Sequence, residues 1–213
     1  MMSRAEQQRL SGSVVGVVIA GGRSVRFGGE KAVAELAGRP LLMWAAARLA
    51  RSCTSVAVNA RPGTEAEAIA QAAGLPVLHD APGDAAGPLA GVKAGLVWAG
   101  ERGASTVAVS PCDVPLLPND LFVRLIAAAG TGAAMAATPE GRQPLCSVWP
   151  VSALEKITAA LANGAHPPTW LMLETIGAVR VGFPESWPFA NINTRADLAA
   201  VASRLERGER QLS

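Results

Sequence analysis

Short apolar runs alternate along the chain with longer segments whose apolar residues recur at helical spacing. The clearest run, Val14 to Ala20, is unbroken and rich in β-branched residues, and it ends at Gly21 and Gly22. Such a run is typical of a strand buried on both faces of a parallel sheet. We expect strands at 14–20, 55–59, 75–80 and 105–113, alternating with helices at 40–50, 64–73, 87–100 and 118–129. This alternation predicts βαβ units and a parallel sheet.

The second half of the chain has a less regular pattern. We expect strands at 133–138, 144–150 and 178–183, a helix at 151–162, and an amphipathic closing helix within 189–208 that begins at an N-cap, Thr194. Residues 163–177 carry no pattern that we can assign. Because no linker or repeat divides the chain, we predict a single domain over residues 13–208, preceded by a flexible polar tail at residues 1–12.

Composition excludes several classes of protein. Of the 213 residues 50% are hydrophobic, which argues against wholesale disorder. Nineteen Lys and Arg residues against 17 Asp and Glu residues give a formal net charge of +2, too balanced for nucleic-acid binding through bulk charge. We therefore expect no nucleic-acid partner, and any anion site must come from a local cluster of cations.

Cysteine usage and hydropathy bear on the compartment. Cys53, Cys112 and Cys146 are isolated in the sequence, without the C-x-x-C spacing of a zinc site or the density of a disulfide framework. The first 13 residues lack the apolar centre of a secretory signal, and no apolar run reaches the roughly 18 residues of a membrane span. We expect a soluble, cytoplasmic protein without a membrane partner.

The loop after the first strand, AGGRSVRFGGEK at residues 20–31, is the strongest candidate for chemistry. Its glycines allow backbone N–H groups to approach an anion closely, and Arg23, Arg26 and Lys31 supply positive charge for a polyphosphate. In open α/β sheets, ligands bind at this end of the strands. The loop does not fit a Walker A motif, because Glu30 precedes the lysine and Ala32 follows it, and G-x-G-x-x-G is absent. The alternative is a glycine-rich turn with surface arginines.

A second candidate lies in SPCDVPLLP, residues 110–118, where Asp113 stands at the tip of a predicted strand, between two prolines. One carboxylate at such a position suits Mg²⁺, which takes one or two carboxylates together with phosphate oxygens and water. The alternative is an Asx turn in which Asp113 caps backbone N–H groups. The metal interpretation gains weight because two strands of the same sheet would end in complementary groups, cations and a carboxylate.

These residues resemble a known family. VVIAGGRSVRFGGEK, residues 17–31, resembles the signature loop of the small nucleotidyltransferases, approximately L-A-G-G-x-S-x-R-M-G-x-D-K. Four later blocks, in the family's order, resemble one branch, the molybdenum cofactor guanylyltransferases: GPLAGVKAGL, SPCDVPLLP, QPLCSVWP and NINTRADL. The resemblance runs from about residue 14 to about residue 200. It implies an α/β fold, a single-domain, Rossmann-like three-layer αβα sandwich with a mostly parallel sheet, as in the nucleotide-diphospho-sugar transferases.

The chain departs from the family pattern at four places. Ile19 and Phe27 replace Leu and Met and keep an apolar side chain, whereas Glu30 replaces Asp and lengthens the acidic arm. The segment HPPTWLMLE, residues 166–174, does not match the pattern expected before the last strand. If that segment contacts the acceptor, this departure bears on which acceptor the protein uses.

The resemblance implies transfer of GMP from GTP to molybdopterin with release of pyrophosphate, with Mg²⁺ as cofactor. Lys31, Arg26 and Asp113 would be catalytic, and Asp113 would hold the metal. The N-terminal half would bind GTP through these residues: Ile19, Ala20, Gly21, Gly22, Arg23, Lys31, Asn59, Asp80 and Asp113. From the residues alone, Asn59 could equally be a strand-end turn residue, and Asp80 a loop carboxylate.

The C-terminal half would bind the acceptor through Gln143, Asn191 and Asn193. The two asparagines stand two residues apart in an extended piece and so share a face, although capping of the last helix would also explain them. The acceptor's terminal phosphate needs no deprotonation, so neither His79 nor His166 is required as a base. The family also implies delivery of the product to molybdenum-enzyme chaperones or apo-enzymes.

Other functions compete with this prediction. A CTP-dependent molybdopterin cytidylyltransferase is the nearest rival, although the AGG opening and the GPLAG block favour the guanine branch. A sugar-phosphate nucleotidyltransferase fits less well, because its G-G-x-G-T-R opening does not match residues 21–26. A non-catalytic nucleotide-binding protein on the same fold is a third possibility, since fold does not fix function. Retention of both Lys31 and Asp113 argues against it.

Overall fold

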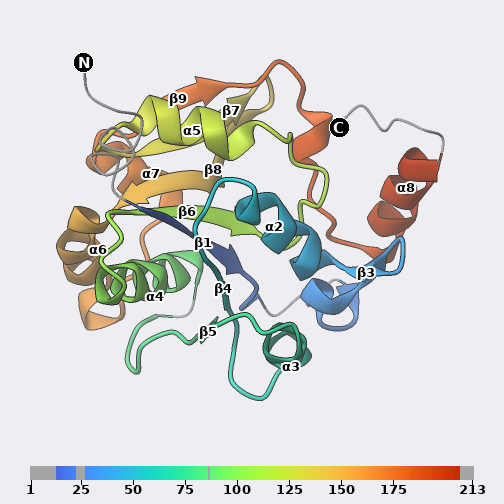
Figure 1. Cartoon of the computed structure of the whole chain (residues 1–213), viewed down its shortest axis with the longest axis horizontal. Helices are drawn as coiled ribbons and strands as arrows, with labels where there is room; N and C mark the ends of the chain where they lie inside the picture. Colours follow the sequence, from blue (N-terminus) through green and yellow to red (C-terminus); the bar gives the residue numbers. More distant parts are fainter. Residues whose placement is uncertain (1–12, 23–26, 86, 207–213) are drawn as a thin grey trace.

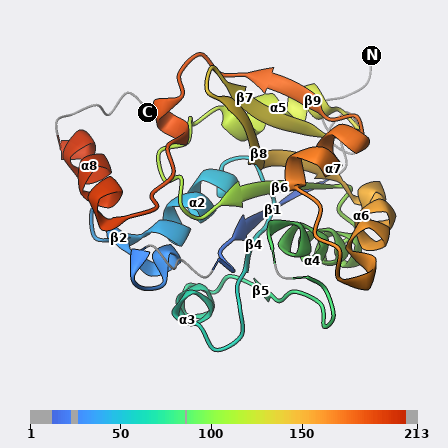
Figure 2. The ribbon, with the colours of Figure 1, turned by 180° about the vertical axis from the view of Figure 1, so that it is seen from behind.

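A seven-stranded sheet forms the centre of the computed structural model, which describes residues 13–22, 27–85 and 87–206 (Figures 1 and 2). The predicted tail at 1–12 and the two arginines Arg23 and Arg26 lie outside these residues. The strands lie in the order β5-β4-β1-β6-β8-β7-β9. Their bounds are β1 Val14–Ile19, β4 Val56–Asn59, β5 Val77–Leu78, β6 Thr106–Pro111, β7 Ala134–Thr138, β8 Gly141–Pro150 and β9 Val179–Gly182.

The sheet is mostly parallel, as predicted. β1 pairs in parallel with β4 on one side and β6 on the other, and β4 pairs in parallel with β5. β8 runs antiparallel to both β6 and β7, and β7 pairs in parallel with β9. Every strand except β8 therefore places its carboxyl end at the same edge, the edge toward which the arrows of β1 and β6 point in Figure 1.

Helices cover both faces of the sheet and give three layers. One face carries α2 (Leu41–Ala50), α3 (Glu65–Ala72) and α5 (Leu121–Ala129), and the other carries α4 (Pro88–Glu101), α6 (Leu154–Leu161) and α7 (Thr169–Thr175). α4 lies close to β1 because its Gly95 has no side chain: an added Cβ would stand 2.8 Å from a methyl group of Val17. The αβα sandwich expected from the resemblance is thus present.

A third apolar cluster lies beside the sandwich. It joins β2 (Glu35–Leu36), which pairs with β3 (Arg39–Pro40), and the start of α2 to the closing helix α8 (Arg195–Glu206). Phe27 and Ile192 are buried in it, and one stripe of α8 packs against them through Leu198, Val201, Ala202 and Leu205. This spacing of i, i+3, i+4 and i+7 confirms the predicted amphipathic closing helix.

The second half differs from the sequence prediction in two places. Residues 169–175 of the unassigned segment form α7, whose Met172 and Leu173 pack against the core. β8 begins at Gly141 rather than at residue 144, because residues 141–143 pair with the end of β7. The pairing jumps from Met135 with Ser147 to Ala136 with Gln143, so β8 bulges and brings Gln143 to the edge of the sheet where the parallel strands end.

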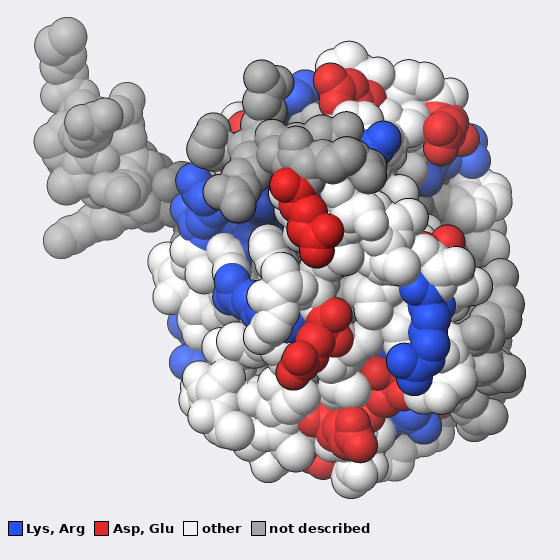
Figure 3. Space-filling view, turned by 90° about the vertical axis from the view of Figure 1, so that its right-hand side faces the viewer, with Lys and Arg blue, Asp and Glu red and all other residues white. Residues whose placement is uncertain are grey.

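The surface at the end of the molecule that carries α8 mixes both signs of charge. Figure 3 shows lysine and arginine side chains interspersed with acidic ones on this face. Among the described residues, no helix is both long enough and apolar enough to cross a membrane.

Candidate active site

The functional side chains predicted in the first half meet at the carboxyl edge of the sheet. β1 ends at Ile19, which pairs with Asn59 at the end of β4 and with Pro111 at the end of β6. The backbone N–H of Ala20 donates to the carbonyl of Asn59 at 2.8 Å, so the first residue of the glycine-rich loop is tied to the neighbouring strand. The predicted nucleotide residues therefore begin on three adjacent parallel strands, as expected for a ligand site in an α/β sheet.

Lys31, Asp113 and Asn193 form the centre of this site. The Lys31 ammonium donates to Asp113 Oδ2 at 2.6 Å and to Asn193 Oδ1 at 3.2 Å. The Lys31 and Asp113 side chains are 14% and 19% exposed, so the ion pair is mostly buried but still in contact with solvent. A cation and a carboxylate predicted separately from two loops thus lie in direct contact.

Backbone contacts fix this cluster from both sides. The N–H of Ile192 donates to the carbonyl of Asp113 at 2.9 Å, which places Asn193 beside the aspartate. Lys31 begins a short 3₁₀ turn, and the preceding Glu30 accepts a hydrogen bond from the N–H of Glu65 at 2.9 Å. Glu65 is the first residue of α3, so the glutamate that departs from the family pattern holds the lysine loop against a helix N-terminus.

Asn59 and Asp80 form a second polar pair at the same edge. The Asn59 amide donates to Asp80 Oδ1 at 3.0 Å and to the carbonyl of Leu78 at 3.3 Å. Its Oδ1 lies against α4, where a Cβ added to Gly91 would stand only 2.3 Å away, and it also lies near Gly21. Asn59 is 3% exposed and is therefore held tightly between a glycine of the loop and a glycine of the helix.

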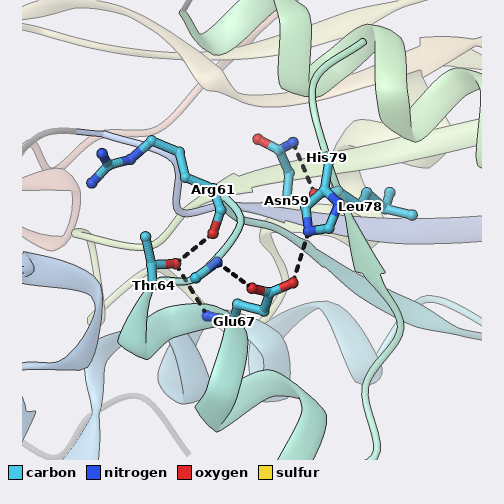
Figure 4. Close-up of polar contacts among 7 residues, drawn as sticks. Asn59, Arg61, Thr64, Glu67, Leu78 and His79 are labelled. Atoms are coloured by element: carbon cyan, nitrogen blue, oxygen red, sulfur yellow. Dashed lines mark hydrogen bonds and ion pairs between the residues drawn. The ribbon is translucent and has the colours of Figure 1, made fainter. Parts of the chain in front are cut away.

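The first turn of α3 borders this pair (Figure 4). Thr64 is the N-cap of α3, and its Oγ1 accepts from the N–H of Glu67 at 3.4 Å, while Glu67 accepts from the N–H of Gly63 at 2.6 Å. Glu67 also pairs with His79 at 2.8 Å. The hydrogen bond from Gly63, and then that from His79, lower the pKa of Glu67. His79 thus has a structural partner beside the site.

The remaining predicted acceptor residues are less constrained. Gln143 on β8 donates to Thr138 Oγ1 at 3.4 Å, at the end of β7. Asn191 is exposed, two residues before Asn193 in the stretch that leads to α8. The structure therefore separates the three predicted acceptor residues: Asn193 binds Lys31, whereas Gln143 binds Thr138 at the end of β7 and Asn191 is exposed in the coil before α8.

His166 is a neighbour of the site that the sequence did not assign. Its ring packs directly on Gly87, the N-cap of α4, because a Cβ on Gly87 would fall 1.7 Å from the imidazole Cε1. Four residues further along the helix, Gly91 contacts Asn59. The segment that departs from the family pattern therefore reaches the nucleotide half of the edge. Its sequence carries no signal for this contact, which depends on the path of the chain between α6 and α7.

The cysteine beside Asp113 is not a nucleophile. Burial, and then the neighbouring Asp113 charge, raise the pKa of Cys112 to about 12, so its thiol stays protonated near neutral pH. Burial also raises the pKa of Cys146. Cys53, Cys112 and Cys146 are all free thiols. The described side chains at the centre of the site offer charge and hydrogen bonds.

The donor set at the centre fits Mg²⁺ only together with a ligand. Within the described residues no group of three His, Cys, Asp or Glu side chains could hold a metal by itself. Asp113 supplies one carboxylate, and Lys31 occupies one of its oxygens. This set suits Mg²⁺, which is commonly held by one or two carboxylates while substrate phosphates and water complete its octahedron.

Comparison with known proteins places the chain in a family. The family model described as "MobA-like NTP transferase domain" matches residues 16–173. Molybdenum cofactor guanylyltransferases from Cereibacter sphaeroides and Rhodobacter capsulatus are 40% and 38% identical to the chain; the matches cover 90% and 91% of it and 97% of each relative.

Solved structures show the same fold. The molybdopterin-guanine dinucleotide biosynthesis protein A of Archaeoglobus fulgidus superposes with a TM-score of 0.73 at 21% identity, covering 91% of this chain and 99% of the other. A nucleotidyl transferase from Methanothermobacter also gives 0.73, at 17% identity, covering 92% and 99%. With the family model and the curated relatives, the central sheet and its polar edge lead to one assignment. The chain belongs to the MobA-like NTP transferases, in the family of molybdenum cofactor guanylyltransferases.

Proposed function

We propose that this protein transfers GMP from GTP to molybdopterin, releasing pyrophosphate and forming the guanine dinucleotide form of the molybdenum cofactor. The observation that carries the proposal is the meeting of Lys31, Asp113 and Asn193 at the carboxyl edge of the sheet, beside the Asn59–Asp80 pair. These five residues come from five separate regions of the chain. Relatives about 40% identical over 90% of the chain carry the guanylyltransferase name and support the same reaction.

Nucleotidyl transfer depends chiefly on positioning and charge neutralisation. Lys31 is the cation for this task, because its ammonium already stands at the strand ends with a carboxylate at 2.6 Å. When a triphosphate binds, its α-phosphate oxygens would replace Asp113 as the partner of Lys31, while Asn193 keeps its bond to the ammonium. The lysine would then offset the negative charge that develops as pyrophosphate leaves, while backbone N–H groups at Gly21 and Gly22 contact the phosphates.

Asp113 would hold Mg²⁺ once Lys31 moves to the phosphate. The metal supplies charge neutralisation and fixes the triphosphate in one orientation. The exchange of partners explains why the carboxylate and the ammonium are neighbours: each is neutralised by the other before the nucleotide and the metal arrive. Arg23 and Arg26 remain predicted phosphate contacts on the strength of the resemblance.

The Asn59–Asp80 pair suits guanine. Asn59 holds one oxygen of the Asp80 carboxylate, which orients the other oxygen. A carboxylate accepts two hydrogen bonds side by side, and guanine offers two adjacent donors, the N1–H and the exocyclic amine. Cytosine offers one amine next to a ring acceptor, which a carboxylate would repel. This difference favours GTP over CTP, with Ile19 and Ala20 contributing backbone contacts at the end of β1.

Gln143 and Asn191 would contact the acceptor in this proposal, with Asn193 between the acceptor and Lys31. The acceptor attacks through a phosphate oxygen that is already ionised near neutral pH, so the site needs no general base. The residues of this edge come from both halves of the chain, in keeping with a single domain over residues 13–208. Delivery of the product to molybdenum-enzyme chaperones or apo-enzymes, and a cytoplasmic location, stay predictions from the family.

Pyrophosphate release tests the proposal. Purified protein is incubated with Mg²⁺, molybdopterin and GTP, CTP, ATP or UTP in turn, with bare and metal-loaded acceptor. We expect release with GTP and its loss in Asp113→Ala. Release with CTP alone would assign the protein to cytidylyl transfer. Tight GTP binding without release from any nucleotide would contradict the proposal and favour a non-catalytic nucleotide-binding role.

A further inference from the structure

Asp197, on the first turn of α8, connects the closing helix to the catalytic cluster. Its Oδ2 accepts hydrogen bonds from two consecutive backbone N–H groups, that of Asn193 at 2.9 Å and that of Thr194 at 2.8 Å. In return the N–H of Asp197 donates to Thr194 Oγ1 at 3.1 Å. The exchange between Thr194 and Asp197 is a capping box built with aspartate.

The bond to Asn193 goes beyond what capping needs. A capping box satisfies the N-cap N–H, here that of Thr194, whereas Asp197 also binds the N–H of the residue before it. Asn193 is the residue whose side chain accepts from Lys31. The same carboxylate oxygen that begins α8 therefore fixes the backbone from which the Asn193 amide reaches the lysine.

The neighbouring residue shows why such an anchor matters. Ile192 is fully buried, and its N–H is bound to the carbonyl of Asp113. This fixes the chain up to Ile192 but leaves the Asn193 backbone to be oriented from the other side. The hydrogen bonds to Asp197 lower its pKa, chiefly the bond from Asn193, with a smaller contribution from the charge of Lys31. The Asp197 carboxylate therefore stays ionised near neutral pH, the form that accepts both backbone N–H groups.

We infer that Asp197 is a positioning residue for guanylyl transfer, holding Asn193 in register with Lys31 and Asp113. The inference deepens the proposed function and rests on it. Asp197 touches neither substrate; it acts through Asn193. Loss of such a supporting contact costs about 10- to 100-fold in rate at comparable sites, because a small displacement near the reacting atoms is enough.

A set of three variants separates positioning from helix capping. Asp197→Ala removes both bonds to Oδ2, whereas Thr194→Ala removes the other half of the capping box and leaves the Asn193 bond intact. We expect Asp197→Ala to lower kcat about 10- to 100-fold with the KM for GTP changed less than about threefold. Thr194→Ala should stay within about threefold of the unmodified protein in kcat, although both variants lose a helix cap. Equal kcat values for the two would overturn the inference.

Asp197→Asn gives a rescue. Its amide oxygen can accept the same two N–H groups, so we expect kcat within about tenfold of the unmodified protein. If Asp197→Asn is as slow as Asp197→Ala, the carboxylate acts through its charge and not through Asn193, and the inference is wrong.

A second readout works without turnover. The side-chain amide of Asn193, labelled with ¹⁵N, should change chemical shift in Asp197→Ala and keep it in Thr194→Ala. If the unmodified protein releases no pyrophosphate, the proposed reaction fails, and the resonance still tests the position of Asn193. An unchanged Asn193 resonance in Asp197→Ala would contradict the inference in either case.

Discussion

The two halves of the polar edge differ in how far they are organised before any ligand arrives. On the proposed nucleotide side the polar side chains form two hydrogen-bonded pairs. Lys31 binds Asp113, and Asn59 binds Asp80 and the carbonyl of Leu78. On the acceptor side Gln143 has one long hydrogen bond at the end of a bulged strand pair, and Asn191 is exposed. The sheet topology explains the difference. Parallel neighbours such as β1, β4 and β6 all end at this edge, whereas β8 is antiparallel and its pairing with β7 near this edge is interrupted by a bulge.

Loss of the Asp113 carboxylate should lower activity more than any other substitution in the proposed nucleotide half. In Asp113→Ala the proposed metal ligand is lost and Lys31 loses its carboxylate partner at 2.6 Å. We expect kcat/KM for pyrophosphate release to fall by about 10³-fold, the upper end of what one preorganised electrostatic contact contributes. Thermal unfolding of the same variant is the control. A melting temperature near that of the unmodified protein together with unchanged turnover would show that Asp113 is not catalytic.

A methyl group at Gly91 should disturb the Asn59–Asp80 pair without touching Lys31. The new Cβ would stand 2.3 Å from Asn59 Oδ1, so the buried amide must move and release Asp80. We expect Gly91→Ala to raise the KM for GTP about tenfold and to destabilise the fold by about 1–3 kcal/mol.

Gly100→Ala on the same helix is the matched control. Its Cβ would meet its nearest neighbour, a methyl group of Val151, at an ordinary 3.8 Å. Replacing a helical glycine should stabilise the protein by about 0.5–1 kcal/mol and leave KM unchanged. The interpretation of Gly91 is lost if both variants bind GTP equally well in a titration.

Substitutions in the proposed acceptor half should weaken acceptor binding without changing the stability of the fold. Gln143→Ala and Asn191→Ala remove side chains that hold little of the fold together, so we expect unchanged melting temperatures. The KM for molybdopterin should rise about three- to tenfold in each, roughly the loss of one hydrogen bond, while the KM for GTP stays constant. A rise in the KM for GTP instead would place these residues on the nucleotide side.

His166 tests where the boundary between the halves lies. It belongs to the second half of the chain but packs on Gly87 at the start of α4. We expect His166→Ala to change the KM for GTP by about two- to fivefold, because one exposed contact to the helix start is lost. An effect on the KM for molybdopterin alone would assign the imidazole to the acceptor half.

The smallest effect should be a pH dependence. The pKa of Asp197 is lowered from 3.8 in the folded chain, so the carboxylate stabilises the fold above that pH and loses this effect as pH falls through its lower folded value. The melting temperatures of Asp197→Asn and the unmodified protein should therefore differ by a constant amount above about pH 5 and converge in acid below 3.8. A difference in melting temperature that grows in acid would contradict this prediction.

The sequence allowed much of the organised half to be predicted. Asn59, Asp80 and Asp113 each stand at or just after the end of a short apolar strand, and strand ends in a parallel sheet converge. The contact between Lys31 and Asn193 could not be predicted from spacing, because 162 residues separate the pair. It depends on the path of residues 183–194 around the sheet.

The other omissions have local causes. The helix α7 was missed because Trp170, Leu171, Met172 and Leu173 are all apolar while only the last two are buried, which hides the helical period. Pro167 and Pro168 just before it suggest a loop. The early start of β8 was missed because its first residues, Gly141 and Arg142, read as a turn.

The 162-residue separation between Lys31 and Asn193 has a consequence for how the protein is made. Ribosomes add roughly 5–20 residues per second, so the asparagine leaves the ribosome about 10–30 s after the lysine. The strands β1, β4 and β6 can pair during that interval, but the catalytic cluster cannot close. A nascent chain can therefore carry an assembled sheet edge without its last polar contact, and the proposed activity would begin only once the final stretch before α8 has docked on Asp113.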